Sequence, residues 1–331
     1  MPIIEQDSWR TQYFEGVDCP DDIVIPTDDE YAYRLYPHFR WIYNKLLICE
    51  TQNLEHAPHG VAPQRFPVFS KPVYNLRGMG VGSRVIASRE EYEHVQQPGH
   101  MWMPLLDGEH VSSDVALVDG EPVWWRHVLG QALGDGVFDY WTVLAERRPG
   151  IELYCGNWLR RHLPGYSGCV NLETIGGTII EAHLRFADQW PDLYGNGWIE
   201  AVVSLYAQGV WSFAGRGCRT GYSVVLSGPP GLTLPRFDRG AVPGLLAGPE
   251  ISSIQITFDE GRLAAGHAMP PGGPRLAVVN CWDLGAGFAV RERLAEMMAL
   301  PPSTRKGTPL CAPGADADRG RVPGSAVSGR D

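Results

Sequence analysis

The sequence predicts an α+β fold, in which antiparallel strands alternate with a few short helices. The first observation is a pair of alternating segments, 168–173 and 178–185, separated by Gly176 and Gly177. Both glycines can take the positive φ that a tight hairpin turn needs. The second is another strand pair, 111–118 and 122–128, around an Asp-Gly turn. The third is a set of segments with helical character, at 31–54, 152–163, 199–206 and 289–300.

In the first part of the chain, the apolar segment 22–26 predicts a short buried strand that ends at a proline. After the helical segment 31–54, residues 66–72 predict a strand that carries a lysine near its end. A glycine-rich stretch and a short acidic helix follow, with Ser88 as the helix N-cap. Residues 101–106 predict the next strand, which leads into the 111–128 strand pair.

In the second part, residues 130–150 are rich in glycine and aromatic side chains and predict a loop. The glycine- and proline-rich region beyond the third helix predicts strands at 222–226, 251–258 and 275–280. The tail from Pro301 contains almost no bulky apolar residues. It cannot bury enough surface to offset the entropy of ordering, so residues 301–331 are expected to be disordered.

The 168–185 hairpin carries the most distinctive chemistry of the chain. Side chains on a strand alternate between two faces, so Asn171 and Glu173 share one face of the first strand. Glu181, His183 and Arg185 share one face of the second, and pairing brings the two polar faces together. Hard divalent cations that hold phosphates prefer oxygen ligands of this kind. The alternative is a solvent-facing hairpin with ordinary polar residues.

Composition excludes several classes of protein. The 331 residues carry a net charge of -10, which argues against a nucleic acid or an anionic membrane as a general electrostatic partner. No apolar run approaches the roughly 18 residues of a membrane span, and the N-terminus lacks the pattern of a signal peptide. A cytoplasmic location is expected. The seven cysteines are scattered without a Cys-x-x-Cys pair, so reduced thiols are expected instead of disulfides or a zinc site.

The order of these segments resembles the ATP-grasp superfamily, which includes D-alanine–D-alanine ligase and biotin carboxylase. The resemblance covers residues 22–298. It rests on a colinear set of motifs: Asn44-Lys45-Leu46, Phe66-Pro67-Val68-Phe69-Ser70-Lys71-Pro72, Gly78 to Gly82, Met101 to Glu109, Asp114 to Arg126, and the Asn171–Arg185 hairpin. It implies a small subdomain at 46–104 and a large one at 105–300. Residues 1–45 would be the remnant of a truncated N-terminal α/β domain, and 301–331 a disordered tail.

The resemblance also implies a nucleotide site. Lys45 and Lys71 match the family's two phosphate-binding basic positions, and a compact ammonium suits that task. Gly78, Gly80 and Gly82 match the loop over the triphosphate, where glycines let backbone N–H groups approach phosphate oxygens. Met101, Trp102 and Met103 match the strand that recognises adenine, and Asp107 or Glu109 would take the ribose contact. For each group the alternative is ordinary packing or a surface role.

In the family's metal site, an acidic residue on the first hairpin strand faces a Glu-x-Asn pair on the second. Here Glu181 matches the glutamate, and His183 replaces the asparagine. Asn171 or Glu173 takes the first-strand position; the resemblance favours Asn171, and Glu173 is the next residue on the same face of the strand. The resemblance implies ATP and Mg²⁺ as cofactors, with Mn²⁺ a further option because Mg²⁺ disfavours nitrogen ligands. Arg185 and Arg126 are the implied catalytic residues.

The implied reaction is ATP-dependent ligation, in which a carboxylate becomes an acyl phosphate and is then joined to an amine or a similar nucleophile. Two alternatives stay open: a nucleotide-binding protein without ligase activity, motivated by the truncated N-terminus and by His183, and a small-molecule kinase on the same fold. The implied partners are small-molecule acids and amines, with neither nucleic acid nor membrane, and a homodimer is compatible with this interpretation.

Overall fold

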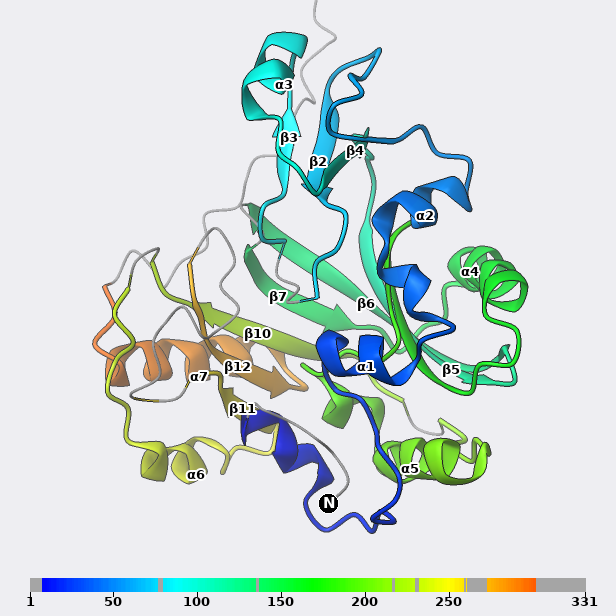
Figure 1. Cartoon of the computed structure of the whole chain (residues 1–331). Coiled ribbons are helices and arrows are strands. Elements are labelled where there is room, and N and C mark those ends of the chain that lie inside the picture. The colour runs from blue at the N-terminus through cyan, green and yellow to red at the C-terminus, as the bar shows by residue number, and fades with distance from the viewer. Residues whose placement is uncertain are drawn as a thin grey trace, which may run out of the picture.

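The computed structural model describes residues 8–76, 80–134, 137–215, 218–229, 232–258, 260 and 273–301. It contains two antiparallel sheets with helices packed around them, which confirms the α+β class. In Figure 1 the small sheet stands above the large one, and α2 (Lys45–Glu50) lies beside the junction of the two. Among the described residues, no helix combines the length and the apolar character that a membrane crossing needs.

The small sheet has the strand order β1-β4-β2-β3. One face packs on α3 (Arg89–Val95) through Trp102, Val68 and Tyr92. The opposite face carries Met101 and Met103, which pack toward α2 and the large sheet. The strands are β1 (Ala57–Pro58), β2 (Val68–Pro72), β3 (Arg84–Ile86) and β4 (His100–Pro104).

The large sheet has eight strands in the order β11-β12-β10-β7-β6-β5-β8-β9. The predicted hairpin forms β8 and β9 at one edge, and the late strands of the chain form the other. The strands are β5 (His110–Val118), β6 (Glu121–Gly134), β7 (Val137–Val143), β8 (Gly168–Ile175), β9 (Thr178–His183), β10 (Gly221–Ser227), β11 (Ile251–Ile256) and β12 (Arg275–Cys281).

Both faces of the large sheet are covered. One face packs on α4 (Pro149–His162) near β5 and β8, and on α7 (Leu284–Met297) near β10 and β12. The opposite face packs on α5 (Trp198–Gln208) and on an aromatic cluster around Trp190 and Tyr194. The remaining short helices are η1 (Ser8–Phe14), α1 (Asp29–Leu35), η2 (Arg40–Tyr43), η3 (Pro191–Tyr194), η4 (Arg239–Ala241) and α6 (Val242–Leu245).

Several predicted elements differ from the structure. Residues 130–150 are not a loop, because β6 continues to Gly134 and β7 follows it. Segment 22–26 has no strand assignment, although Ile25 is fully buried. The helical segment 31–54 is divided into α1, η2 and α2, since α2 has its own N-cap: the Asn44 side chain accepts from the Leu46 N–H at 3.0 Å. The predicted disordered tail lies outside the described residues beyond Pro301.

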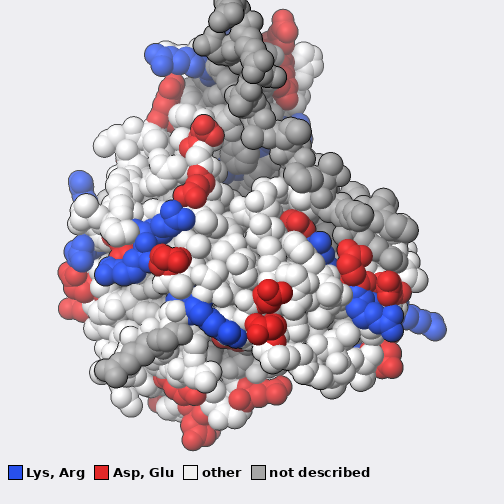
Figure 2. Space-filling model, turned by 180° about the vertical axis from the view of Figure 1, so that it is seen from behind, with Lys and Arg blue, Asp and Glu red and all other residues white. Residues whose placement is uncertain are grey.

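On the face drawn in Figure 2, acidic and basic side chains are interspersed. Within the described part of that face, no broad field of one sign is visible.

Candidate functional site

The β8–β9 hairpin brings its polar faces together in the predicted way. Glu173 lies opposite Glu181, and Asn171 lies opposite His183. The turn uses positive φ at both glycines, +56° at Gly176 and +83° at Gly177. The prediction that these four polar side chains share one face of a hairpin is therefore confirmed.

A β-bulge at Ile180 interrupts the register of the hairpin. Thr174 pairs with Ile179 and Glu173 with Glu181, so Ile180 is an extra residue on β9. Its carbonyl oxygen accepts a hydrogen bond from Lys71 Nζ at 2.8 Å. The bulge thus joins β2 of the small sheet to the edge of the large sheet, next to the Glu181 carboxylate.

Both predicted phosphate-binding lysines lie at this junction. Lys45, the first residue of α2, places Nζ 2.7 Å from Glu181 Oε1. Lys45 and Lys71 are each only 4% exposed. Burial lowers the pKa of the Lys71 ammonium to about 8. The negative charge of Glu181 opposes this change, and the positive charge of Lys45 adds to it. The structure therefore brings two amines and a carboxylate together from three separate parts of the sequence.

Glu173 has a partner that the sequence did not reveal. His110, the first residue of β5, places Nε2 3.1 Å from Glu173 Oε2. Burial alone would raise the pKa of Glu173, but the hydrogen bond and charge of His110 outweigh it and hold the pKa below its usual value. His110 follows the predicted strand 101–106 by four residues, and neither a motif nor a period marked it.

His183 is held by a second residue that the sequence did not reveal, Asp29 of α1. His183 Nδ1 lies 3.0 Å from Asp29 Oδ1, and Arg185 donates to Asp29 Oδ2 at 2.8 Å. Tyr43 also donates to Oδ1 at 3.2 Å. Burial would raise the pKa of Asp29, but Arg185 and His183 lower it strongly. Burial would lower the pKa of His183, but the Asp29 charge raises it overall.

Asn171 is turned toward β5 instead of toward the site. Its amide nitrogen donates to Ser112 Oγ at 2.9 Å and to Asp114 Oδ1 at 2.7 Å. Asp114 is 1% exposed, and it also accepts from the Ala187 N–H and the Tyr194 hydroxyl. Burial raises the pKa of Asp114 to about 6. Asn171 therefore contributes to a buried polar network instead of the site for which the resemblance favours it, whereas Glu173, on the same face, is paired with His110.

Arg126 lies on the same face of the large sheet but is 4% exposed. Its guanidinium donates to the Arg219 and Leu193 carbonyl oxygens at 2.9 and 3.5 Å. This geometry gives Arg126 a role in packing, and its role in catalysis stays a prediction. Arg185 differs: it lies just past the end of β9 and is bonded to Asp29 beside His183.

The predicted adenine strand forms β4, and its side chains divide between two faces. Met101 and Met103 pack against Ile180 and α2. The Trp102 side chain faces the other way, where its Nε1 donates to the Val61 carbonyl at 2.7 Å. Of the three predicted adenine-binding residues, Met101 and Met103 face the junction of the sheets, where Leu106 from the end of the predicted strand packs with them.

The predicted glycine loop is partly outside the described residues, which include Gly80 and Gly82 but not Gly78. Gly80 and Gly82 both have positive φ. The two ribose candidates are exposed, and Glu109 pairs with Arg148 at 3.3 Å. Asp107 accepts a hydrogen bond from its neighbour, the Gly108 N–H.

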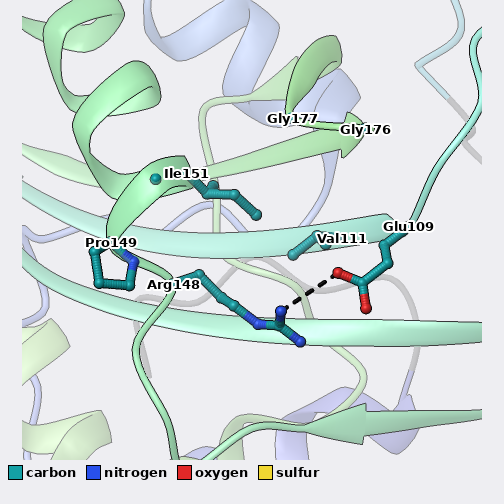
Figure 3. A pocket seen from close by; sticks show the side chains of 8 residues that line it. Glu109, Val111, Arg148, Pro149, Ile151, Gly176 and Gly177 are labelled. Atoms are coloured by element: carbon teal, nitrogen blue, oxygen red, sulfur yellow. Dashed lines mark hydrogen bonds and ion pairs between the residues drawn. The ribbon is translucent and has the colours of Figure 1, made fainter.

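A pocket of about 300 Å³ lies next to Glu109, between the hairpin turn and the start of α4. Figure 3 shows Glu109 and Arg148 reaching toward each other across it, with Pro149 and Ile151 on one side. Val111, which also lines the pocket, pairs with Thr174, so it faces away from Ser112 and Glu173. The pocket is therefore on the opposite face of the sheet from Glu181 and the lysines.

Within the described residues, no three His, Cys, Asp or Glu side chains form a group that could hold a metal ion by themselves. At the sheet junction, two potential metal donors, Glu181 Oε1 and His183 Nε2, lie 4.0 Å apart. Two protein donors suit a cation that takes its remaining ligands from substrate phosphates and water, which is how nucleotide-bound Mg²⁺ is commonly held.

No model of a protein family matches the sequence, and no curated protein matches it. Solved structures do match in fold. L-amino acid ligase from Bacillus licheniformis aligns with a TM-score of 0.58 at 14% identity, over 87% of this chain and 82% of that one. Phosphoribosylamine–glycine ligase from Thermotoga maritima aligns with a TM-score of 0.56 at 15% identity, over 86% and 85%.

The biotin carboxylase domain of 2-oxoglutarate carboxylase from Hydrogenobacter thermophilus, in complex with MgADP, ADP and bicarbonate, is also similar. Its TM-score is 0.56 at 12% identity, over 84% of this chain and 74% of that one. The chain has the ATP-grasp fold. The fold predicted from the order of its motifs is therefore confirmed, and at these identities the similarity concerns the fold alone.

Proposed function

We propose that this protein is an ATP-dependent ligase that activates a carboxylate as an acyl phosphate and joins it to an amine or a similar nucleophile. The observation that supports this most is the meeting of Lys45, Lys71 and Glu181 where the two sheets join. The solved structures with this fold include an L-amino acid ligase and a phosphoribosylamine–glycine ligase, which are named for this class of reaction.

In the proposed site, the two buried ammonium groups hold the nucleotide phosphates. Lys71 donates to a neutral carbonyl oxygen, and burial makes its charge costly, so an anionic phosphate is a better partner for it. Lys45 is paired with Glu181. Phosphate oxygens would take over Lys45 and leave the Glu181 carboxylate free to hold a cation.

A divalent cation, Mg²⁺ or Mn²⁺, would be held by Glu181 and His183, with Glu173 next to them. When bound, it neutralises charge on the β- and γ-phosphates. The donor set fits a cation of this kind because Glu181 is 20% exposed and lies next to a histidine nitrogen at 4.0 Å. Arg185, held in place by Asp29, would supply positive charge to the acid or to the acyl phosphate.

The proposed chemistry has two steps. An oxygen of the substrate carboxylate attacks the γ-phosphorus, the bond to the β,γ-bridging oxygen breaks, and ADP leaves with that electron pair. The nucleophile then attacks the acyl carbon and the carbon–oxygen bond to phosphate breaks, releasing inorganic phosphate and the proton of the nucleophile. Phosphoryl transfer asks the protein chiefly for positioning and charge neutralisation, which is what lysines, a cation site and an arginine provide.

The test combines nucleotide binding with product analysis. Calorimetry with ATP and magnesium measures binding, and ADP release is then screened against acids paired with amines. Lys71→Met and Glu181→Gln should abolish ADP release, whereas Glu30→Gln, on the exposed side of α1, should leave it unchanged. ATP binding without turnover under any pairing would favour a nucleotide-binding protein, and a stable phosphorylated product would favour a kinase. Normal turnover in both site variants would show that the site assignment is wrong.

A further inference from the structure

His183, the last residue of β9, is a buried histidine that is bonded to a carboxylate on one side of its ring. The His183 side chain is 3% exposed, and its Nδ1 lies 3.0 Å from Asp29 Oδ1. Its other nitrogen, Nε2, lies on the side of Glu181, 4.0 Å from Oε1. The ring of Tyr43 packs against the imidazole edge, with centroids 6.2 Å apart. The ring therefore has one bound nitrogen and one that faces the carboxylate.

This arrangement determines which nitrogen of a neutral imidazole carries the proton. Asp29 Oδ1 lies 3.0 Å from Nδ1, closer than the Arg185 guanidinium at 3.5 Å. A carboxylate only accepts hydrogen bonds, so Nδ1 is the donor to Asp29. The lone pair of the neutral ring is then on Nε2, toward Glu181. A carboxylate behind a histidine is the usual outer-shell partner of metal-binding imidazoles, because it fixes the tautomer and the orientation of the ring.

Asp29 is itself held firmly enough for this role. It is 3% exposed, and its second oxygen accepts from Arg185 at 2.8 Å. The Tyr43 hydroxyl donates to the same oxygen that His183 binds, at 3.2 Å, and is itself held by the Leu184 N–H, which donates to it at 3.0 Å. Asp29 comes from α1, so the N-terminal part of the chain completes the site formed by the hairpin.

We propose that Asp29 is a positioning residue that presents His183 Nε2 as a metal ligand beside Glu181, so that this site prefers a divalent cation that accepts an imidazole nitrogen over Mg²⁺. The inference rests on the proposed function, because the cation would arrive with the nucleotide phosphates. Affinity of a mixed nitrogen and oxygen site rises along the first transition row from Mn²⁺ onward, whereas Mg²⁺ favours oxygen donors and keeps its waters.

The experiment uses the full chain with ADP and Mn²⁺ as the probe, and reads the metal's ligands by pulsed electron paramagnetic resonance. The wild type should show the ¹⁴N modulation of a directly bound imidazole. His183→Asn should lose this ¹⁴N modulation. The same variant should also have a smaller preference for Mn²⁺ over Mg²⁺ than the wild type. Asp29→Asn should weaken Mn²⁺ binding by about 10- to 100-fold, the range found for outer-shell partners of metal ligands. Glu30→Gln, in the same helix, should leave the spectrum and both affinities unchanged.

The outcomes separate this inference from the proposed function. ADP and Mn²⁺ binding without nitrogen modulation in the wild type would overturn the role of His183 and Asp29, and would leave the nucleotide site standing. Failure to bind ADP with either cation would overturn both. If Asp29→Asn is not folded, as judged by circular dichroism, the wild-type and His183→Asn spectra still decide the question. A spectrum that His183→Asn leaves unchanged would assign the nitrogen to another residue and overturn the proposal.

Discussion

Replacing Lys71 by methionine should stabilise the protein without nucleotide while removing nucleotide binding. Lys71 lies on β2, 4% exposed, opposite Met101 of β4 and facing the apolar contacts around Met103. Its ammonium donates to the Ile180 carbonyl oxygen. Methionine has a similar length and carries no charge, so it fills the same space without the cost of burying an ion.

The magnitude follows from the pKa of Lys71, which burial lowers from 10.5 to about 8. Each tenfold change in proton affinity is worth about 1.4 kcal/mol, so holding the charged form in the folded state costs about 3 kcal/mol. Loss of the hydrogen bond to Ile180 costs about 1 kcal/mol in the other direction. The expected gain for Lys71→Met at pH 7 is therefore about 2 kcal/mol in the free energy of unfolding.

The stability difference between Lys71→Met and the wild type should also depend on pH. Between pH 8 and pH 10.5 the unfolded chain binds more protons at this lysine than the folded protein does. The cost of burying Lys71 therefore falls, and the free energy of unfolding of the wild type rises, as the pH rises through this range. The advantage of Lys71→Met should therefore shrink as the pH rises through this range. Urea unfolding of both proteins at pH 7 and near pH 10 measures the difference. A variant that is destabilised equally at both pH values would refute the view that Lys71 is a charge buried at a cost.

Three further predictions concern the stability of the fold. The pKa of Asp114 is raised from 3.8 to about 6, so the folded wild type loses free energy of unfolding when the pH rises and this carboxyl group ionises. Asp114→Asn should therefore gain up to about 3 kcal/mol relative to the wild type between about pH 4 and about pH 7. Parallel pH profiles of urea unfolding for the two proteins would contradict this. Gly176→Ala should destabilise by about 1–3 kcal/mol, since φ is +56° there and a Cβ would collide with the Asp107 carbonyl oxygen; Gly177→Ala, with open space around the Cβ, is the comparison, and equal losses would attribute the effect to φ alone. Tyr13→Phe should lower the free energy of unfolding by about 1–3 kcal/mol, because its hydroxyl is buried against the Gln189 carbonyl and the β11–β12 polar side chains; an unchanged urea midpoint would show that this contact is dispensable.

The hairpin could be predicted because its information is local. Period-2 alternation placed the four polar side chains on one face, and two adjacent glycines specified a turn that only positive φ allows. The bulge at Ile180 was not predicted, although Ile179 and Ile180 together break the alternation. That pair was visible in the sequence, and it is the signal that could have indicated the carbonyl that Lys71 binds.

The partners of the site residues could not be predicted, since they come from distant parts of the chain. Asp29 contacts His183 across more than 150 residues, and His110 contacts Glu173 across 63. Nothing in the local sequence distinguishes Asp29 from the neighbouring Asp28, which instead caps α1 by accepting from the Tyr31 N–H. Which of two adjacent aspartates caps the helix and which one is buried depends on the direction of α1 relative to β9, and this direction is set by tertiary packing.

Most of the charged side chains at the sheet junction are matched in pairs within the protein. Glu181 is paired with Lys45, Glu173 with His110, and Asp29 with His183 and Arg185. Lys71 differs, because its hydrogen bond goes to a neutral carbonyl and its pKa is depressed. A buried cation whose direct partner is neutral is held at a cost, and an incoming phosphate relieves that cost. The same property that makes Lys71 unfavourable for the free protein therefore makes it the strongest candidate for the first contact with a nucleotide.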